Sequence, residues 1–320
     1  MSHDLEFEKP IVEIERKIEE LKNLTSDKKL DFEPELKRLE ARLEKMKKEI
    51  FNQLTPWQRV QLARHPKRPF TLDYVALMMK DFVEVHGDRL FADDRALIGG
   101  LAKLGQKRVV VIGHQKGRDT KENLQRNFGS AHPEGYRKAM RLMKLAEKFH
   151  LPLISFVDTP GAYPGIGAEE RGQAHAIAEN IRLMAGLRTQ IIVIVIGEGG
   201  SGGALGIGLG DRVCVLENAY YSVISPEGCS AILWKDRTKA LEAAESLKLT
   251  AKDLFEMGLI DRLIEEPLGG AHRNHDESAE RVGQVIEECL EELSHIELDE
   301  LLRQRYEKFR KIGVFHEGGG

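Results

Sequence analysis

Ile191-Ile-Val-Ile-Val-Ile-Gly-Glu-Gly-Gly-Ser-Gly-Gly-Ala-Leu-Gly-Ile-Gly-Leu-Gly210 is the stretch that decides the fold of this chain. Its first six residues are all β-branched, which predicts a strand buried on both faces, as parallel strands usually are. The chain then turns at Gly197, and we expect a helix of small residues from Ala204. A buried strand, a glycine-rich turn and a helix in succession predict one unit of a parallel α/β sheet.

Glycines dominate the turn, where they fill five of the seven positions 197–203. Because glycine has no Cβ, the backbone N–H groups of such a turn can approach a ligand closely. At a helix start these N–H groups also lack intrahelical acceptors, and the helix dipole favours negative charge. The turn therefore predicts an oxyanion site made of main-chain amides. The alternative is that the glycines serve only the close packing of the turn.

A second unit of the same kind precedes this one. Residues 153–158 form an apolar strand pattern, the loop 159–167 contains three glycines, and a helix pattern follows. A reduced version recurs at 220–234. Because ligands bind at the carboxyl ends of the strands in parallel sheets, we expect both glycine loops to line one site.

Composition narrows the class of protein. The 320 residues carry 48 Lys and Arg against 52 Asp and Glu, so net charge indicates neither a nucleic-acid partner nor an anionic membrane. The three cysteines form no disulfide framework and no metal-ligand spacing, and zinc ligation is not expected. No signal peptide or membrane-spanning run is seen, which predicts a cytoplasmic protein.

Three parts are predicted along the chain: an N-terminal helical extension over 1–55, an α/β core over 56–270 and C-terminal helices over 271–320. Apolar residues at spacings of three and four predict a helical pair within 11–50. This pair can close on itself as a hairpin or offer a surface to a partner subunit, and the sequence leaves both open. The C-terminal helices are amphipathic and need a surface to pack on.

Between these ends, strands and helices alternate. A helix beginning at Thr71 or Asp73 is expected to include Phe82, and residues 62–74 should form an extended connector. Residues 116–130 are a polar excursion, and Pro133 opens a helix to about residue 149. Further strands are expected at 96–104, 108–113, 211–217 and 220–224.

Other chemistries fit less well. The glycine spacing matches neither the dinucleotide-binding fingerprint nor a Walker loop. Ser201 on a strand-to-helix turn could serve as the nucleophile of a hydrolase, with His175 or His132 as its base, but neither histidine has a recognisable triad context. The predicted site is thus rich in amide donors and poor in acids, bases and nucleophiles. Such a site suits a reaction limited by a developing enolate.

Several motifs together resemble one family. The chain is similar to the carboxyltransferase α subunit of bacterial and plastid acetyl-CoA carboxylase over nearly its whole length. The motifs that carry the resemblance lie at 64–74, 113–118, 158–165, 165–172, 196–204, 221–229 and 266–273.

The resemblance implies a crotonase fold, in which repeated ββα turns form two nearly perpendicular sheets. It also implies a heterotetramer with two β subunits that carry a zinc ribbon, together with a biotin carboxyl carrier protein and biotin carboxylase. The implied reaction moves the carboxyl group of carboxybiotin, supplied by the carrier, to acetyl-CoA and gives malonyl-CoA, the first committed step of fatty acid synthesis. No covalently bound cofactor and no metal are expected on this chain.

The resemblance also assigns roles to individual residues. The backbone amides of Gly202 and Gly203 are expected to form the oxyanion hole, and those of Gly161 and Ala162 to bind the transferred carboxyl group. The expected substrate-binding residues are Gly199, Gly200, Ser201, Lys116, Arg118 and Tyr163. Two other hypotheses are an acyl-CoA hydrolase or isomerase of the same fold, working as a homo-oligomer, and a non-catalytic scaffold.

Overall fold

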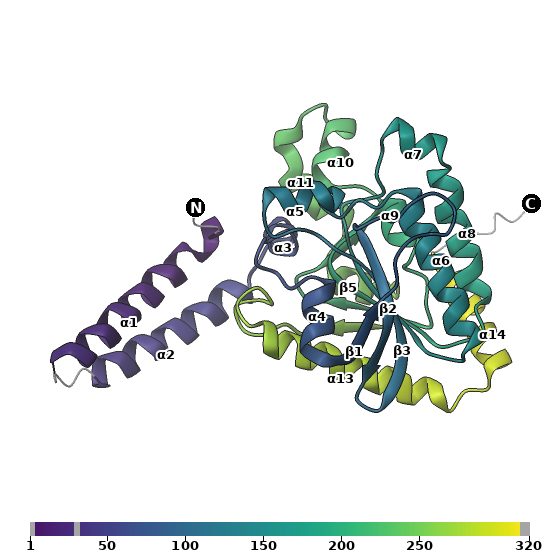
Figure 1. Ribbon diagram of the computed structural model, residues 1–320. Coiled ribbons are helices and arrows are strands. Elements are labelled where there is room, and N and C mark those ends of the chain that lie inside the picture. Colours follow the sequence, from purple (N-terminus) through teal and green to yellow (C-terminus); the bar gives the residue numbers. More distant parts are fainter. Residues whose placement is uncertain (1–3, 29–32, 314–320) are drawn as a thin grey trace, which may run out of the picture.

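The structure, a computed structural model, describes residues 4–28 and 33–313. In these residues a single sheet of eight strands runs in the order β1–β2–β3–β4–β5–β6–β8, and β7 pairs with β5 (Figure 1). The first three strands pair antiparallel and the others pair parallel. The strands are β1 (Met79–Glu84), β2 (Leu97–Leu104), β3 (Lys107–His114), β4 (Leu153–Thr159), β5 (Ile191–Gly200), β6 (Arg212–Leu216), β7 (Tyr220–Ser222) and β8 (Arg262–Ile264).

Helices surround this sheet and extend the chain at both ends. Short 3-10 turns lie at Glu6–Glu8, Asn127–Gly129 and Arg237–Lys239. The α-helices are α1 (Lys9–Lys28), α2 (Glu33–Phe51), α3 (Pro56–Ala63), α4 (Thr71–Met78), α5 (Thr120–Gln125), α6 (Pro133–Lys148), α7 (Ile166–Glu170), α8 (Gln173–Gly186), α9 (Ser201–Leu205), α10 (Pro226–Leu233), α11 (Ala240–Leu247), α12 (Ala251–Glu256), α13 (His275–Ser294) and α14 (Leu298–Arg310). None of these described helices has the length and apolar character needed to cross a bilayer.

Strand β5 lies inside the sheet, where it pairs with β4, β6 and β7, as its β-branched sequence predicts. All ten of its residues are buried, because β4 and β6 flank it and helices cover both faces. The strand continues beyond the predicted turn at Gly197, since Glu198–Gly200 pair with β7. The helix correspondingly begins at Ser201 rather than at Ala204. The glycine loop is therefore a tight junction between strand and helix.

Most predicted elements are confirmed, and the differences have local causes. Phe82 was expected in a helix but lies in β1, because the chain from Met79 onward pairs with β2. Helix α4 was expected to be capped by Thr71 or Asp73, but its N-cap is Phe70. Asp73 lies in the first turn, where its side chain accepts the N–H of Phe70 at 2.7 Å. The connector is shorter than predicted, since α3 extends to Ala63 and α4 starts at Thr71. The polar excursion contains α5. Two separate sheets were expected, but the described residues form one sheet, from which β7 branches by pairing with β5.

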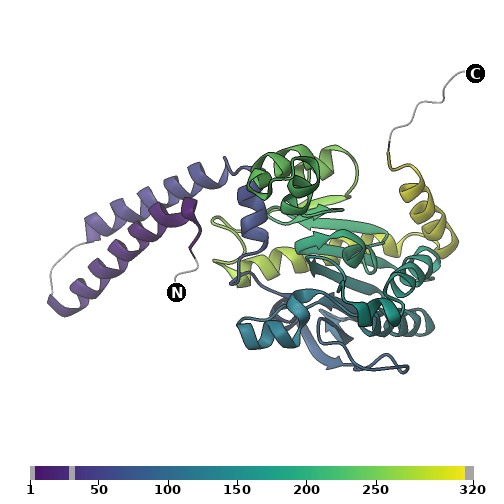
Figure 2. The ribbon, with the colours of Figure 1, turned by 90° about the horizontal axis from the view of Figure 1, so that it is seen from above.

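The N-terminal helices form a hairpin that projects from the body (Figures 1 and 2). Helices α1 and α2 run side by side, and an ion pair of 2.8 Å joins Lys22 to Glu40. At the base, Ile11 and Phe51 pack with Leu62 of α3. The structure shows a hairpin closed on itself and anchored to the core at one end, and a partner-binding role for its outer surface stays a prediction.

A buried cluster ties this base to the other end of the core. Glu8 Oε1 lies 3.0 Å from His272 Nε2 and accepts Arg273 Nε at 2.9 Å. Burial alone would raise the pKa of Glu8, but its hydrogen bond to His272 and the charge of Arg273 lower it to about 2. The carboxylate is therefore ionised and firmly held.

The C-terminal helices pack on the sheet and on α8, as their amphipathic pattern predicts. Arg305 of α14 is fully buried and donates from Nε to Asp211 Oδ1 at 2.7 Å. The other oxygen of Asp211 accepts the N–H of Ile191 at 2.7 Å. Helix α14 is thereby connected to the first residue of β5 through a single carboxylate.

Candidate active site

The two glycine loops meet at the carboxyl ends of β4 and β5, as predicted. A Cβ on Gly203 would overlap the amide nitrogen of Ala162 and lie 2.6 Å from the carbonyl carbon of Gly161. Likewise, a Cβ on Gly200 would overlap the carbonyl of Pro160. Strands β4 and β5 pair in parallel from Leu153 and Ile191 to Thr159 and Gly199, with one register shift between Val157 and Thr159, so their loops leave the same edge of the sheet. Glycine is required here for backbone contact between loops, as the packing interpretation held.

The backbone amides of Gly202 and Gly203 are the candidate hydrogen-bond donors of this site. In the described part of the chain, neither donates a hydrogen bond to a backbone or side-chain acceptor. A Cβ on Gly202 would meet only Ile177 Cδ1, at 3.9 Å, so the space beside it is open. The Gly203 carbonyl is held on the protein side, because it accepts the Tyr136 hydroxyl at 3.2 Å. The loop is thus held through its carbonyl, and the amides of the half-buried Gly202 and the buried Gly203 remain without a protein acceptor in the described residues.

The neighbouring turn offers fewer free donors than predicted. The Gly161 amide donates to Thr159 Oγ1 at 3.1 Å, and the Thr159 hydroxyl donates to the Gly161 carbonyl at 2.9 Å. The Tyr163 amide donates to the Ala131 carbonyl at 3.0 Å. Of the two amides expected to bind the transferred carboxyl group, that of Gly161 is therefore already engaged. Ala162, which lies against Gly203, is the better candidate.

The remaining residues of the glycine loop have different surroundings. Gly199 and Gly200 are buried in β5, where a Cβ on Gly199 would press on the Tyr221 ring at 2.7 Å. Ser201 is exposed and has a φ of +48°, a value that non-glycine residues seldom adopt. Tyr163, half-buried, stacks on the His132 ring with centroids 4.1 Å apart.

The triad that a hydrolase would need is not assembled. Ser201 makes no hydrogen bond to a histidine among the residues that the structure describes. His132 instead bonds to Asn127 at 2.9 Å and stacks on Tyr163, while His175 is exposed on α8. The geometry gives Ser201 no general base.

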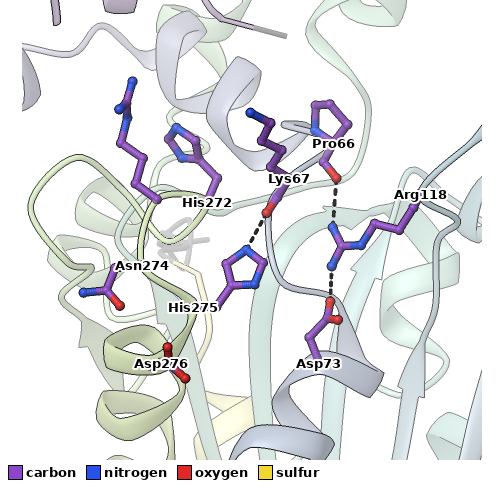
Figure 3. Close-up of a pocket in the computed structure, with 9 residues that line it drawn as sticks. Pro66, Lys67, Asp73, Arg118, His272, Asn274, His275 and Asp276 are labelled. Carbon is purple, nitrogen blue, oxygen red and sulfur yellow. Dashed lines mark hydrogen bonds and ion pairs between the residues drawn. The ribbon is translucent and has the colours of Figure 1, made fainter. Parts of the chain in front are cut away.

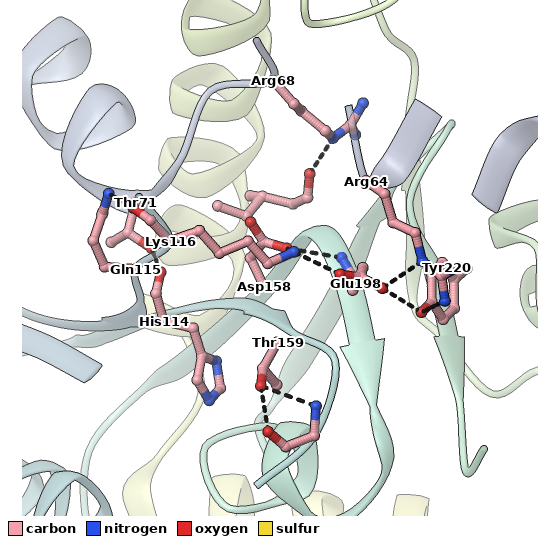
Figure 4. A network of polar contacts seen from close by, with 12 residues as sticks. Arg64, Arg68, Thr71, His114, Gln115, Lys116, Asp158, Thr159, Glu198 and Tyr220 are labelled. Atoms are coloured by element: carbon pink, nitrogen blue, oxygen red, sulfur yellow. Dashed lines mark hydrogen bonds and ion pairs between the residues drawn. The ribbon is translucent and has the colours of Figure 1, made fainter. Parts of the chain in front are cut away.

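An ion-pair network, missed as such from the sequence, joins the ends of β4 and β5 (Figure 4). Lys116 Nζ donates to Asp158 Oδ1 at 2.6 Å and to Glu198 Oε2 at 2.8 Å. The other oxygen of Glu198 accepts Arg64 Nε and the Tyr220 hydroxyl, each at 2.7 Å. Burial would raise the pKa of Glu198, but the charges of Lys116 and Arg64 lower it to about 2. The sequence signal was an acid at the end of each of two consecutive buried strands.

Lys116 is consequently not placed to bind a phosphate. Only 12% of its side chain is exposed, and its ammonium group is occupied by two carboxylates. Its expected role as a substrate contact is replaced by a role within the protein, because strand ends carrying two buried acids require a buried cation between them.

Arg118 also has protein partners, beside a cavity of about 700 Å³ (Figure 3). Its Nη1 donates to the carbonyls of Pro66 and Arg68, each at 2.8 Å, and its Nη2 pairs with Asp73. Its guanidinium lies 4.1 Å from the centre of the Phe70 ring. Arg118 therefore holds the connector between α3 and α4, and its donors are used there.

Two further buried groups complete the surroundings. Arg68 pairs with Glu266, with Nη1 3.0 Å from Oε2, and its Nε donates to the Ile196 carbonyl of β5 at 2.6 Å. His114, at the end of β3, is completely buried, and its ring lies beside the backbone of Gly203 and Phe156 without a hydrogen bond of good geometry in the described residues. Burial lowers the pKa of His114 to about 3, so the ring is neutral.

One cluster has the residue types of a metal site. Ligand atoms of Glu8, His65 and His272 lie within 4.8 Å of one another and are buried. However, Arg273 donates to Glu8, and His65 Nδ1 accepts the N–H of Lys67 at 3.2 Å. A cation beside an arginine would be repelled, so these contacts fit the anchor of the hairpin better than a metal.

Comparison with known proteins identifies the family. The family model described as acetyl co-enzyme A carboxylase carboxyltransferase-like matches residues 4–313. The acetyl-coenzyme A carboxylase carboxyl transferase subunit alpha of Halalkalibacterium halodurans is 58% identical over 315 residues, which are 98% of this chain and 97% of the relative. The chain belongs to the acetyl-CoA carboxylase carboxyltransferase α-subunit family. The subunit alpha of Geobacter metallireducens is also 58% identical, and the match covers 98% of this chain and 99% of the length of that relative.

Solved structures place the family's fold among crotonase-type carboxyltransferases. The transcarboxylase 12S structure aligns with a TM-score of 0.59 over 72% of this chain and 42% of its own, at 18% identity. A Pseudomonas malonate decarboxylase hetero-tetramer in complex with coenzyme A aligns with a TM-score of 0.56 over 67% of this chain and 85% of its own, also at 18% identity. These likenesses confirm the predicted fold class, and the family confirms a carboxyltransferase subunit.

Proposed function

We propose that this chain forms the α-subunit half of a carboxyltransferase site. This site moves the carboxyl group from carboxybiotin, borne by a biotin carboxyl carrier protein, to acetyl-CoA and gives malonyl-CoA. One observation carries the assignment of the site. The amides of Gly202 and Gly203 have no protein acceptor in the described residues and lie where two strand ends meet. The site needs no nucleophile or general base from this chain.

In this proposal the two amides hold the ureido oxygen of biotin. Negative charge develops on that oxygen as the bond between N1′ and the carboxyl carbon breaks, and two preplaced N–H donors stabilise it there. The Ala162 amide, beside Gly203, is proposed to orient the transferred carboxyl group. The carboxyl group leaves N1′ as CO₂, and the ureido anion takes a methyl proton from acetyl-CoA. The resulting thioester enolate then forms the new C–C bond to the carbon of CO₂. This chain supplies orientation and electrostatic stabilisation.

A partner is proposed to complete the site. The curated relatives are named alpha subunits, which supports a complex with a β subunit. We propose a zinc-ribbon β subunit in a heterotetramer of two α and two β chains, acting in the cytoplasm with biotin carboxylase. Helices α7 and α10 both lie above α9 in Figure 1, and each carries exposed apolar side chains, which supports docking there. They are Ile166, Ile232 and Leu233, which are 80%, 71% and 64% exposed.

Reconstitution tests the function. The chain is purified alone and with the β subunit, then given carboxylated carrier protein and acetyl-CoA. We expect malonyl-CoA only when both subunits are present, and a heterotetramer mass by light scattering. Turnover of an acyl-CoA by this chain alone would support the homo-oligomeric hydrolase or isomerase instead. Tight binding of β without turnover would support the scaffold.

A further inference from the structure

A buried carboxylate lies within the last residues of each strand that leads into a loop of the candidate site. Asp158 precedes the turn with Gly161 and Ala162, and Glu198 precedes the loop with Gly202 and Gly203. Their side chains are only 2% and 8% exposed. Two adjacent buried carboxylates repel each other and lose hydration, so their strand ends would separate without a counter-charge.

Lys116 supplies this counter-charge from a third strand end. It follows β3, which pairs with β4, and its Nζ lies 2.6 Å from Asp158 and 2.8 Å from Glu198. Burial would lower the pKa of Lys116, but the two carboxylates raise it, so the ammonium group stays charged. A Cβ on Gly129 would lie 2.9 Å from Lys116 Cγ, which indicates that the stem of the side chain is closely covered.

The backbone of β5 is pressed onto the same group. The Glu198 amide donates to Asp158 Oδ1 at 3.0 Å, the oxygen that also accepts Lys116. A Cβ on Gly197 would lie 2.5 Å from that oxygen. A shift of Asp158 would therefore move the peptide that leads into the Gly202–Gly203 loop, and no flexible side chain lies between them to absorb the shift.

We propose that Lys116 is a positioning residue that sets the distance between the two amide-bearing loops during carboxyl transfer. It does so by holding Asp158 and Glu198 on one ammonium group. This inference rests on the proposed function and adds to it a residue that does not touch substrate. If it is correct, replacing Lys116 lowers the rate of carboxyl transfer more than it lowers the affinity for substrate.

The test compares Lys116→Met and Lys116→Arg in the complex with the β subunit. Because misplacement by about 1 Å can cost roughly 100-fold in rate, we expect kcat to fall about 100-fold in Lys116→Met while KM for acetyl-CoA changes less than about threefold. Lys116→Met should also lower the thermal midpoint of unfolding, because it removes the buried charge. Lys116→Arg keeps the charge and should have a midpoint close to that of the wild type. It should restore kcat only partly, since a planar guanidinium cannot occupy the position of the ammonium group. Lys144→Met, an exposed lysine on α6, is the matched control.

The results that contradict this inference differ from the result that contradicts the proposed function. The inference is wrong if both Lys116→Arg and the folded fraction of Lys116→Met have the kcat of the wild type. It is also wrong if the substitutions raise KM and leave kcat unchanged. If Lys116→Met does not fold, a full recovery of kcat in Lys116→Arg also overturns it, and a partial recovery in folded protein supports it. An inactive wild-type complex would instead count against the proposed function itself.

Discussion

The α-carbon of Gly203 lies against the amide nitrogen of Ala162, with no room between them for a methyl group. The loops after β4 and β5 are therefore one interlocked unit. A side chain at position 203 must displace one loop from the other, although the position itself contributes only backbone.

Gly203→Ala should accordingly cut malonyl-CoA formation, and Gly203→Val should abolish it while the complex with β still forms. Losing one oxyanion donor costs roughly 100- to 1,000-fold in rate. Turnover is measured with carboxylated carrier, and assembly by light scattering. Gly186→Ala is the control, because a Cβ there meets nothing within 4 Å. Full activity in Gly203→Val would refute the site assignment.

Glu266→Gln should destabilise the protein strongly. The substitution leaves Arg68, which is 1% exposed, buried beside a neutral group, and such a loss costs about 3–5 kcal/mol. Urea unfolding followed by circular dichroism measures it. Glu300→Gln, at an exposed ion pair with Arg303, should leave the midpoint unchanged. Equal midpoints for the two variants would contradict the importance of the buried pair.

His114 should make stability depend on pH. Its folded pKa of about 3 lies below the ordinary value of 6.5, so between these values the unfolded chain binds a proton that the folded chain excludes. Stability from this group is complete above pH 6.5 and falls by about 1.4 kcal/mol per pH unit as the pH is lowered toward 3. His114→Leu should flatten the profile of unfolding free energy between pH 6 and pH 4 by that slope. Parallel profiles for variant and wild type would refute this.

Glu8→Gln should loosen the hairpin without unfolding the core. It removes the charge that holds His272 and Arg273, and the wild-type contact should weaken likewise as the pH falls from about 4.5 toward the lowered pKa of about 2. Hydrogen exchange in α1 and α2 is expected to rise, with exchange in β5 unchanged. Glu20→Gln, on the exposed face of α1, serves as control. Unaltered exchange in Glu8→Gln would show that apolar packing alone anchors the hairpin.

The sequence predicted the elements whose signals are local. The β-branched run predicted β5, and Pro133 predicted the start of α6. It could not predict that the chain beyond Gly197 stays extended, because that depends on pairing with β7. Local pattern does not report such distant partners.

The side-chain networks were missed for the same reason. Lys116 was predicted to bind substrate, and its buried ion pairs were missed because the acids that contact it come 42 and 82 residues later. Glu8 and His272 are 264 positions apart. Charge pairing in the interior is decided by topology, and no spacing rule along the chain reveals it.

The bond from Arg305 to Asp211 has a consequence for synthesis of the protein. The strand that bears the amide site starts at Ile191, yet the carboxylate that holds its first N–H receives its counter-ion only when residue 305 is available. A nascent chain on the ribosome thus contains all residues of the candidate site before Arg305 is available to pair with Asp211. Premature termination before Arg305 would leave the buried carboxylate of Asp211 without its counter-ion at the first residue of β5.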